Sequence, residues 1–297
     1  MKCGFVNIIG RPNVGKSTLL NAILDIHLAI TSDKVGTTRN IINGIYNDEE
    51  AQIVFVDTPG VAKPIHKLNN VLNKKAYSSV DNVDIILFLV DAAAGIGKGD
   101  RFVLDKIKRE NDDIPVFLIL NKIDKLNKEE ILKTIETAKD MYNFSEVIPI
   151  SAIKKDNLDE LVKTIKKYLP EQDRIFSEDE LTNVSTKFIV SEIVREKVLQ
   201  LTEQEIPHAV TCYTEEFLED DDIVNISVVI VVDRDNLKKI IIGKNGNILK
   251  EIGTKARIDI EKLLDKKVYL KTYVKTINNW RDREKYLIEL GISSEEE

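Results

Sequence analysis

Residues 10–17, GRPNVGKS, fit the pattern G-x-x-x-x-G-K-[ST] of a loop that binds nucleotide phosphates. Gly10 and Gly15 let backbone N–H groups approach the phosphates, because no Cβ stands in the way. Lys16 brings a positive charge to the β- and γ-phosphates, and the hydroxyl of Ser17 is a suitable ligand for Mg²⁺. Such a string occurs by chance in roughly one chain of this length in a hundred. By itself the loop therefore indicates only a phosphate site.

A second motif, DTPG at residues 57–60, fits D-x-x-G, the pattern of a loop that senses a nucleotide γ-phosphate. Asp57 can hold a water on Mg²⁺, and the N–H of Gly60 can reach the γ-phosphate. In many GTPases the next residue is a glutamine that orients the attacking water. Here it is Val61, whose side chain neither donates nor accepts a hydrogen bond. Either the chain does not hydrolyse GTP, or another group replaces the glutamine.

Two further motifs indicate which base is bound. NKID at residues 121–124 follows the apolar run VFLIL, and Ser151-Ala152 follows another. Ligands of open parallel sheets bind at the carboxyl ends of the strands. Asp124 can accept the N1–H and the amino group of guanine, whereas adenine presents an acceptor at N1. NKID alone is often only a turn that ends a strand. Four motifs in this order, each at a strand end, make coincidence negligible and indicate a guanine nucleotide.

Another candidate binding loop lies near the C-terminus. Residues 243–246, GKNG, have the pattern G-x-x-G, which without context is most often a glycine-rich turn. Residues 234–285 carry 15 lysines and arginines against seven aspartates and glutamates, a net charge of +8, whereas the whole chain carries −7. A basic stretch on an acidic body indicates a polyanion site confined to one domain. The alternative is a solvated, lysine-rich helix face.

The composition is that of a globular protein with room for two domains. The chain has 297 residues, 43% of them hydrophobic. Cys3 and Cys212 lie far apart and outside any metal-ligand spacing, which favours a reducing compartment. The chain starts with a buried-strand pattern rather than a secretory signal. Its most apolar segment, VDIILFLVDAAAGI, is interrupted by aspartates and is too short to span a bilayer. We therefore expect a soluble protein.

The nucleotide motifs lie on an alternation of apolar runs and amphipathic stretches. Near-continuous apolar strands separated by helices predict a mainly parallel sheet covered on both faces. The expected fold is a doubly wound α/β domain over residues 1–170. The expected strands are FVNIIG, QIVFVDT, DIILFLVDA, VFLILNK and VIPIS, with helices that include LDKIKREN and EEILKTIETAKDMYN.

After residue 170 the pattern changes. The stretch EQDRIFSEDELTN is polar and acidic without periodicity, which predicts a linker over residues 171–185. Residues 186–297 are then expected to form a smaller α+β domain with a charged tail. Its expected elements are the helix TKFIVSEIVREKVLQLT, the strands AVTCYTEEFLE and DIVNISVVIVVD, the G-x-x-G loop, the helix NILKEIGTKARIDIEKLL and the strand VYLKTYVKT.

Residues 1 to about 170 resemble the translation-factor-class GTPases of the group that contains Era, the double-GTPase ribosome factors and the tRNA-modifying GTPases. The resemblance rests on the order of the phosphate loop, GTTRN at residues 36–40, DTPG, NKID and SA. It implies that Thr38, rather than Thr37, closes over the γ-phosphate and ligates Mg²⁺. The sequence itself does not separate these adjacent threonines. The group often has TTRD, whereas this chain has Asn40, so any role of that aspartate is in doubt.

The same resemblance bears on Val61. A hydrophobic residue replaces the glutamine in this group, and some members use a potassium ion, which would offset charge that develops in the transition state. Asn13 matches the asparagine associated with that ion, and the alternative is that it only shapes the loop. Val61 then indicates slow intrinsic hydrolysis rather than none.

The predicted site residues follow from these motifs and from the resemblance. The expected catalytic residues are Lys16, Thr38 and Gly60, and the expected metal ligands are Ser17, Thr38 and Asp57. The nucleotide site is expected to contain Gly10, Asn13, Val14, Gly15, Lys16, Ser17, Thr18, Asp57, Gly60, Asn121, Lys122, Asp124, Ser151 and Ala152.

With residues 186–297 included, nearly the whole chain resembles the Era family, GTPases with a C-terminal type II KH domain. The order helix, strand, strand, G-x-x-G, helix, strand carries this resemblance. NLKKIII before the loop has the β-branched content of a strand, but a KH domain requires a helix there, and we expect the helix. A KH loop clamps about four nucleotides, so the predicted RNA contacts are Gly243, Lys244, Asn245 and Gly246.

The resemblance implies a GTP-controlled factor that binds the 3′ region of small-subunit (16S) ribosomal RNA and helps to assemble the small ribosomal subunit. GTP or GDP and Mg²⁺ are the expected cofactors, with K⁺ as a further candidate. The expected protein is a cytoplasmic monomer without a DNA partner, and a loose peripheral association with the inner face of the cell membrane is left open.

Other functions stay possible on the residues alone, which show a guanine-nucleotide switch fused to a nucleic-acid module. The main alternative is an RNA-binding GTPase that acts on another RNA or in cell-cycle or membrane-linked regulation. A tRNA-modifying enzyme would need a further catalytic domain, for which residues 171–297 lack the length and a reactive cysteine motif. An inactive GTPase would require damage to Lys16, Ser17, Asp57 or Asn121, all of which are intact.

Overall fold

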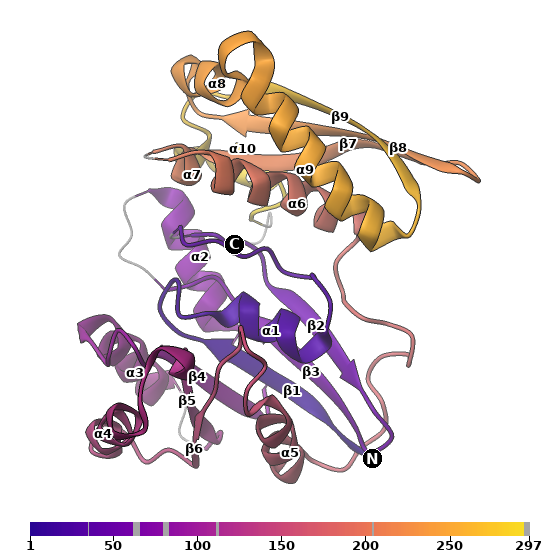
Figure 1. Cartoon of the computed structure of the whole chain (residues 1–297). Coiled ribbons are helices and arrows are strands. Elements are labelled where there is room, and N and C mark those ends of the chain that lie inside the picture. Colours follow the sequence, from indigo (N-terminus) through magenta and orange to yellow (C-terminus); the bar gives the residue numbers. More distant parts are fainter. Residues whose placement is uncertain (35, 62–65, 80–82, 111–112, 204, 294–297) are drawn as a thin grey trace. The chain divides into compact units, whose positions relative to one another are not determined.

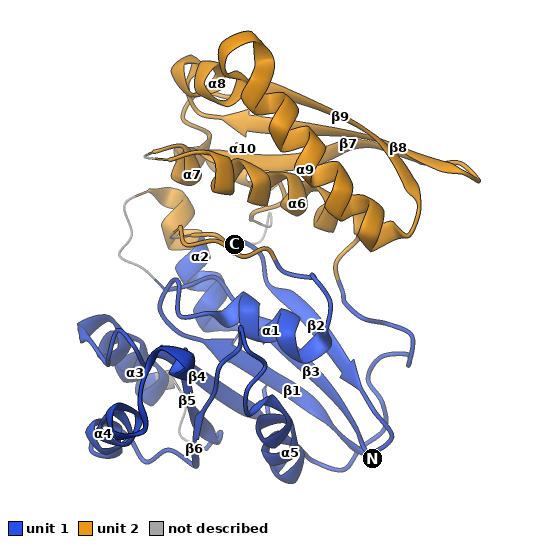
Figure 2. Cartoon of the chain, viewed as in Figure 1, with its two compact units in different colours: residues 1–29, 38–63, 72–183 blue, residues 30–37, 64–71, 184–297 orange. Residues whose placement is uncertain are grey.

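The computed structural model of the chain describes residues 1–34, 36–61, 66–79, 83–110, 113–203 and 205–293. The chain forms two compact units (Figure 2). Unit 1 comprises Met1–Ala29, Thr38–Lys63 and Leu72–Asn183, and unit 2 comprises Ile30–Thr37, Pro64–Val71 and Val184–Glu297. Two short segments from the first part of the sequence thus belong to unit 2. The boundaries 1–170, 171–185 and 186–297 stay a prediction, and the last four residues of the tail lie outside the described residues.

Unit 1 is built on a six-stranded sheet in the order β2-β3-β1-β4-β5-β6 (Figure 1). All neighbouring strands are parallel except β2, which runs antiparallel to β3. The prediction of a mainly parallel sheet is confirmed. The strands are β1 (Lys2–Ile9), β2 (Ile42–Asn47), β3 (Ala51–Asp57), β4 (Ile85–Asp91), β5 (Val116–Asn121) and β6 (Glu146–Pro149).

Most residues of the four inner strands are buried, because both faces of the sheet are covered. Every residue of β3 and β5 is buried, as the continuous apolar runs predicted. On one face, Phe88 and Leu118 join a core cluster with Val103 and Ile107 of α3. The helices of this part of the chain are α1 (Lys16–Leu24), α2 (Lys67–Ser78), α3 (Lys98–Glu110), α4 (Lys128–Lys139) and α5 (Leu158–Tyr168), with a short 3₁₀ turn, η1 (Ile123–Lys125).

The acidic stretch after residue 170 lies against strands β2 and β3. The side-chain carbonyl of Gln52 accepts from the backbone N–H groups of Ile175 and Phe176 at 2.8 and 2.9 Å. The N–H of Ile45 donates to the carbonyl of Leu181 at 2.9 Å. The acidic stretch contributes only backbone groups to these hydrogen bonds. Its lack of side-chain periodicity therefore does not prevent it from lying against the sheet. Residues up to Asn183 consequently belong to unit 1.

Unit 2 has a three-stranded sheet in the order β7-β8-β9, with β7 antiparallel and β9 parallel to β8. The predicted order of helix, two strands, G-x-x-G loop, helix and strand is confirmed (Figure 1). Its elements are α6 (Thr186–Leu201), α7 (Ile206–Ala209), β7 (Val210–Glu219), β8 (Ile223–Val232), α8 (Asp235–Ile242), η2 (Lys244–Gly246), α9 (Asn247–Leu264), β9 (Lys267–Thr276), η3 (Trp280–Asp282) and α10 (Glu284–Glu289).

The expected helix over NLKKIII is present as α8. Leu237 and Ile241 are its buried residues, and four-residue spacing places them on one face of the helix. Asp235 in the first turn also favours a helix, since its charge complements the helix dipole. Burial of this face therefore outweighs the β-branched composition. Among the helices that the structure describes, none combines the length and apolar content needed to cross a membrane.

Candidate functional site

The phosphate loop connects β1 to α1, with Gly15 directly before the helix. Gly15 has φ 103°, and a Cβ at this position would lie 2.3 Å from the amide nitrogen of Asn121. Gly10 is similarly enclosed, since its Cβ would lie 2.4 Å from the carbonyl oxygen of Leu89. Only glycine fits at either place without a shift of its neighbours. The loop therefore leads into a helix N-terminus, where backbone N–H groups and the helix dipole attract phosphate.

A buried cluster of polar groups lies at the start of α1. The Nζ of Lys16 donates to the carbonyls of Gly10 and Arg11 at 3.2 and 3.0 Å. The Oγ of Ser17 donates to Oδ2 of Asp57 at 2.7 Å and lies 2.9 Å from Oγ1 of Thr38. The structure thus brings together, across three separate segments, the three residues predicted as metal ligands.

The charges in this cluster are poorly solvated. Burial lowers the pKa of Lys16 to about 8, and the nearby Asp57 acts in the opposite direction. Burial raises the pKa of Asp57 to about 6, although Lys16 and the hydroxyl of Ser17 favour its charged form. A phosphate beside Lys16 and a cation beside Asp57 would each restore the favourable surroundings that burial removes.

The residues present fit a hard divalent cation. Oδ1 of Asp57 is buried and has no hydrogen-bond partner within the described part of the chain. One carboxylate and two hydroxyl oxygens match the ligand preference of Mg²⁺, which normally completes its coordination with phosphate oxygens and waters. Among the described residues there is no group of three or more His, Cys, Asp or Glu that could hold a metal ion.

Thr37 and Thr38, which the sequence alone could not distinguish as candidate Mg²⁺ ligands, lie in different surroundings. Oγ1 of Thr38 faces the Ser17 hydroxyl, whereas Oγ1 of Thr37 donates to the carbonyl of Lys34 at 2.7 Å. Next to this switch, Oδ1 of Asn40 accepts from Nζ of Lys75 at 3.0 Å. The aspartate that the group often has at position 40 could accept the same hydrogen bond from Lys75. Asn40 therefore preserves this contact.

Asn121 connects three of the predicted motifs. Its Nδ2 donates to the carbonyl of Val14 at 2.9 Å, and its Oδ1 accepts from the N–H of Ala152 at 3.0 Å and of Lys122 at 2.8 Å. Asn121 is 2% exposed, so these bonds are shielded from water. The phosphate loop and the base-binding segments are therefore fixed to one another by a single side chain.

The residues predicted to recognise the base lie at the ends of β5 and β6. Asp124 is exposed, and its Oδ1 accepts from the hydroxyl of Ser151 at 2.5 Å. This bond orients the carboxylate while its other oxygen is available to a base. Lys122 is also fixed, since its Nζ donates to Oδ2 of Asp91 at 2.6 Å and to the carbonyl of Asn13 at 2.7 Å. The remaining predicted residue, Thr18, lies partly buried in the first turn of α1.

Two carboxylates near the site were not predicted. Asp91, at the end of β4, pairs with Lys122, and the buried Asp100 accepts from Nε of Arg11 at 2.7 Å. Each therefore fixes a side chain of a loop that belongs to the predicted nucleotide site. The available signal for Asp91 was its position at the end of an apolar strand, as for Asp57. Asp100 also accepts from the N–H of Gly97 at the start of α3 at 2.8 Å, but its contact with Arg11 spans 89 residues and has no local signal.

The DTPG loop packs against the phosphate loop. A Cβ on Gly60 would lie 2.9 Å from backbone atoms of Pro12, so the two loops are in close contact. Val61 is only 4% exposed and belongs to the core cluster with Ile9 and Phe88. The residue in the glutamine's position is therefore a core residue, which explains why an apolar side chain stands there.

The GKNG loop of unit 2 differs from the phosphate loop in its exposure. Gly243, Asn245 and Gly246 all have positive φ values, 72°, 55° and 77°. Lys244 and Asn245 are exposed, and α9 begins directly after the loop. The backbone thus turns so that the N-terminus of an 18-residue helix is presented beside an exposed lysine.

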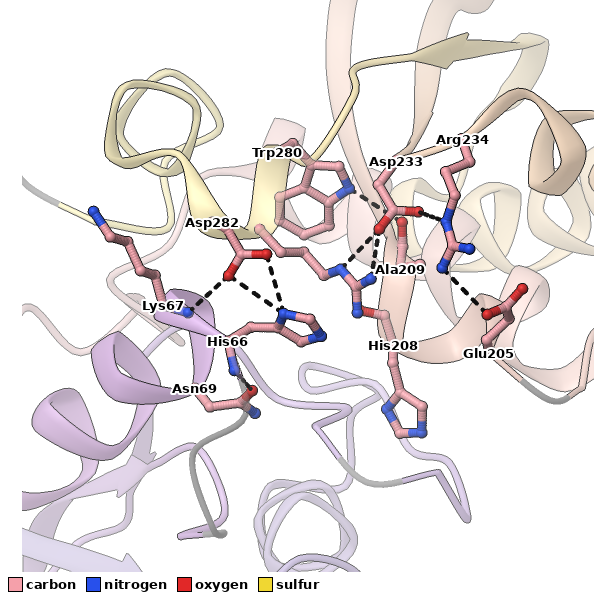
Figure 3. Close-up of polar contacts among 11 residues, drawn as sticks. His66, Lys67, Asn69, Glu205, His208, Ala209, Asp233, Arg234, Trp280 and Asp282 are labelled. Atoms are coloured by element: carbon pink, nitrogen blue, oxygen red, sulfur yellow. Dashed lines mark hydrogen bonds and ion pairs between the residues drawn. The ribbon is translucent and has the colours of Figure 1, made fainter.

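Unit 2 also holds segments that flank the predicted switch residues. The buried Arg195 of α6 donates to the carbonyl of Thr37, and its neighbour Glu196 accepts from the N–H of Thr31 at 2.8 Å. In Figure 3, Asp282 accepts from the N–H of Lys67 at 3.2 Å and lies 3.1 Å from Nδ1 of His66. Residues directly before Thr38 and shortly after the DTPG loop are therefore held in the same unit as the GKNG loop.

The fold and the sites define a class of protein, a P-loop GTPase domain joined to a KH domain. Family models agree, since the 50S ribosome-binding GTPase family matches residues 5–122 and the KH domain family matches residues 205–281.

Comparison of whole chains gives the particular family. The chain is 48% identical to the GTPase Era of Clostridium kluyveri, over 98% of this chain and 99% of that protein. It is 43% identical to a point variant of Aquifex aeolicus Era bound to GDP·AlF4⁻, with a TM-score of 0.94 over 99% of this chain and 100% of the other. An Era in complex with MgGDPNP and nucleotides 1506–1542 of 16S ribosomal RNA gives a TM-score of 0.95 at 43% identity, covering 99% of both chains. The chain belongs to the Era family of GTPases.

Proposed function

We propose that this protein is a GTP-hydrolysing switch that binds the 3′ region of 16S ribosomal RNA and assists assembly of the small ribosomal subunit. The observation that carries the proposal is the presence, in one chain, of a complete set of guanine-nucleotide motifs and an exposed GKNG loop. A relative that aligns over 99% of this chain was solved with both a GTP analogue and a 16S ribosomal RNA fragment.

The nucleotide chemistry follows from the geometry of unit 1. Lys16 and the N-terminus of α1 bind the phosphates, Asp124 and Ser151 bind guanine, and the N–H of Gly60 meets the γ-phosphate. Ser17, Thr38 and Asp57 would hold Mg²⁺, which neutralises charge on the β- and γ-phosphates. Val61 is buried in the core and its side chain cannot hydrogen-bond to the attacking water. Intrinsic hydrolysis is therefore slow, since no side chain at that position orients the nucleophile.

A monovalent cation is the proposed source of the missing charge. Asn13 has φ 64° and lies exposed in the phosphate loop, and its carbonyl is fixed by Lys122 at 2.7 Å. In this proposal its side chain contributes to a cation site once phosphate oxygens are present. GTP turnover should be faster in potassium than in sodium buffer, and Asn13→Ala should abolish the difference. Equal rates in the two buffers for the unmodified protein would remove K⁺ from the mechanism.

The RNA site follows from the geometry of unit 2. A KH loop clamps the backbone of about four nucleotides, and Gly243 and Gly246 allow that backbone to approach closely. The N–H groups at the start of α9 and the charge of Lys244 would contact the phosphates. These groups bind any single strand, so the choice of RNA must come from contacts with bases.

The decisive experiment identifies the RNA in cells. We expect ultraviolet crosslinking, followed by sequencing of the bound RNA, to place the protein at the 3′ region of 16S ribosomal RNA. A variant with Lys244→Asp and Asn245→Asp serves as the control and should lose those crosslinks. Depletion of the protein should also cause incomplete small subunits to accumulate. If the crosslinks were concentrated on another RNA, this proposal would be wrong, and the protein would be an RNA-binding GTPase that acts on that RNA.

Location and assembly are further parts of the proposal. We expect a cytoplasmic monomer with at most loose membrane association. Sedimentation at several concentrations and flotation with anionic liposomes would test the two expectations separately.

A further inference from the structure

Strand β9 carries an unusual row of side chains on one face. Successive residues of a strand point to opposite faces of the sheet, and β9 reads KVYLKTYVKT. The outer row, as we call Lys267, Tyr269, Lys271, Tyr273 and Lys275, is exposed at every position, whereas Val268 and Val274 on the other face are buried.

The outer row lies on the face of the sheet that α9 does not cover. A Cβ on Gly253 of α9 would lie 3.4 Å from Oγ1 of Thr272, so α9 packs on the face to which Thr272 points. The outer row points the other way. Because α9 starts at the GKNG loop, the outer row is not part of the surface that the loop and its helix form.

Edge protection does not explain this composition. β9 is an edge strand of the sheet, and lysines on an edge strand discourage pairing with another chain. Two exposed tyrosines work against that purpose, because they add apolar surface and favour strand formation. Tyr269 is 53% exposed and Tyr273 is 39% exposed. A ligand that uses both aromatic faces and positive charges accounts for the whole row.

The positive charge of the row is available mainly at its C-terminal half. Near the other end, Lys266 pairs with Glu219 at 2.7 Å, and the β7–β8 turn contains three consecutive aspartates, residues 220–222. In the described part of the chain, Lys271 and Lys275 form no ion pair, whereas Lys255 of α9 pairs with Glu251 at 2.8 Å. Lys271 and Lys275 can therefore neutralise charge on a ligand without breaking an ion pair within the described part of the chain.

The spacing suits a single-stranded polynucleotide. Tyr269 and Tyr273 are four residues apart, which is about 13 Å along a strand. Lys271 lies between them, with its Nζ 5.5 Å from the centre of the Tyr269 ring. Two bases could stack on the two rings while the intervening phosphates meet Lys271 and Lys275. Stacking on aromatic rings beside a positively charged track is the common mode of single-strand binding without sequence preference.

We propose that the outer row is a second contact surface for single-stranded RNA, separate from the GKNG loop. The proposal extends the proposed function, because it assumes that unit 2 binds RNA. The row supplies length-dependent affinity by stacking and charge, and it holds the strand that continues beyond the nucleotides clamped by the loop.

The first test compares RNA lengths. A 4-nucleotide and a 16-nucleotide RNA from the small-subunit rRNA 3′ region are compared, with the short sequence contained in the long one. In the variant with Tyr269→Leu and Tyr273→Leu, the long RNA should bind at least about tenfold more weakly, since stacking of bases on both rings is lost. The short RNA should bind as before. Unchanged affinity for the long RNA in a variant that melts like the parent would overturn the proposal.

A fluorescent variant tests binding to the outer row directly, without relying on a loss of affinity. Trp280 is the chain's single tryptophan and is fully buried, so Tyr269→Trp introduces an exposed reporter that can still stack. The fluorescence of this variant should be quenched by the long RNA. When Lys244→Asp and Asn245→Asp are combined with Tyr269→Trp, the RNA should still quench the fluorescence, although at a higher concentration. This result would show that the outer row binds RNA independently of the GKNG loop. If the loop binds RNA and the fluorescence of the Tyr269→Trp variant does not change, the outer row is not an RNA surface.

The lysines have their own readout. Removing two phosphate contacts makes the negative slope of log affinity against log salt shallower by about 1.4 for a single strand. Lys271→Gln with Lys275→Gln should show this change with the long RNA. Lys128→Gln with Lys133→Gln, two exposed lysines of α4, should not. An equal change in both pairs would show only a general charge effect, and binding of anionic vesicles in place of RNA would assign the row to a membrane.

Discussion

The two predicted binding loops are built in opposite ways. In unit 1, Lys16, Ser17 and Asn121 are all less than 10% exposed and are fixed by hydrogen bonds. In unit 2, Lys244 and Asn245 of the GKNG loop are exposed, and the loop is shaped by positive φ values. A small ligand of fixed shape can be enclosed by a preorganised buried network. A polynucleotide must enter from the side, so its site stays open and binds through backbone and charge.

This difference predicts where mutations act. A change in the phosphate loop should disturb both folding and binding, because its side chains are part of a packed structure. A change in the GKNG loop should affect binding with little effect on stability, because exposed side chains contribute little to folding.

The largest effect is expected from Gly15→Ala. The new Cβ would lie 2.3 Å from Asn121 Nδ2, at a φ of 103° that alanine rarely adopts. GTP affinity should fall more than about a hundredfold, or about 2.7 kcal/mol, as measured by titration calorimetry. Gly95→Ala is the matched control, since Gly95 has φ 70° but no atom within 4 Å of the new Cβ. If both variants lost GTP affinity to a similar extent, backbone strain rather than the contact with Asn121 would account for the loss.

The next effect concerns the choice of base. Asp124→Asn should weaken GTP binding by roughly thirtyfold, about 2 kcal/mol, because an amide cannot accept from both guanine donors. The same variant should gain affinity for xanthosine triphosphate, since the amide can donate to the 2-oxo group that a carboxylate repels. Competition assays with the two nucleotides would measure the switch. Unchanged affinities for both would remove Asp124 from the base site.

In unit 2, Lys244→Asp with Asn245→Asp should weaken binding of a 16S ribosomal RNA 3′ fragment by at least about tenfold, because two negative charges face the phosphates. GTP affinity and melting temperature should stay within error of the parent. Fluorescence anisotropy at two salt concentrations provides the measurement. Equal RNA affinity of variant and parent at both salts would contradict the KH assignment of this loop.

The same variant also tests coupling between the two regions. Arg195 and Glu196 of unit 2 hold Thr37 and Thr31, next to the predicted Mg²⁺ ligand Thr38. RNA should therefore raise GTP turnover in the parent and have no effect on the variant. Equal stimulation in both proteins would show that the effect does not pass through the GKNG loop.

The smallest catalytic effect is expected from Val61→Ala. Val61 belongs to the core of unit 1 and offers no hydrogen bond, so turnover should change less than about tenfold, or about 1.4 kcal/mol of barrier. Stability should fall by about 1.6 kcal/mol, because two buried methyl groups are lost. Steady-state hydrolysis and chemical denaturation separate the two effects. If the increase in the activation free energy of hydrolysis exceeded the loss in the free energy of unfolding, Val61 would have a role in the chemistry.

Much of the fold could be read from local patterns. The five predicted strands of residues 1–170 correspond to β1, β3, β4, β5 and β6, and helix α9 has the predicted bounds. Strand β2 was not predicted. Its sequence, INGIYN, lacks a continuous apolar run, and it is held as an antiparallel edge strand by pairing with β3. Its partner, rather than its own composition, makes it a strand.

The nucleotide motifs could likewise be identified from the sequence, because each one is a short run of residues whose backbone and side chains act together. Their mutual arrangement could not. Asn121 joins the phosphate loop to Ala152, and Asp100 supports Arg11, through contacts between residues far apart in the chain. Thr38 and Thr37 are adjacent and chemically identical, and only their three-dimensional surroundings distinguish them.

The sequence by itself determined the classes of chemistry, the order of most elements and the presence of two domains, since glycine spacing, charge and apolar periodicity act over a few residues. Only the tertiary structure decided which surfaces these elements form. It assigned Ile30–Thr37 and Pro64–Val71 to unit 2, and it placed the tyrosines and lysines of β9 on one exposed face. Both outcomes depend on packing between distant segments, and the free energy of such packing is not encoded in any local pattern.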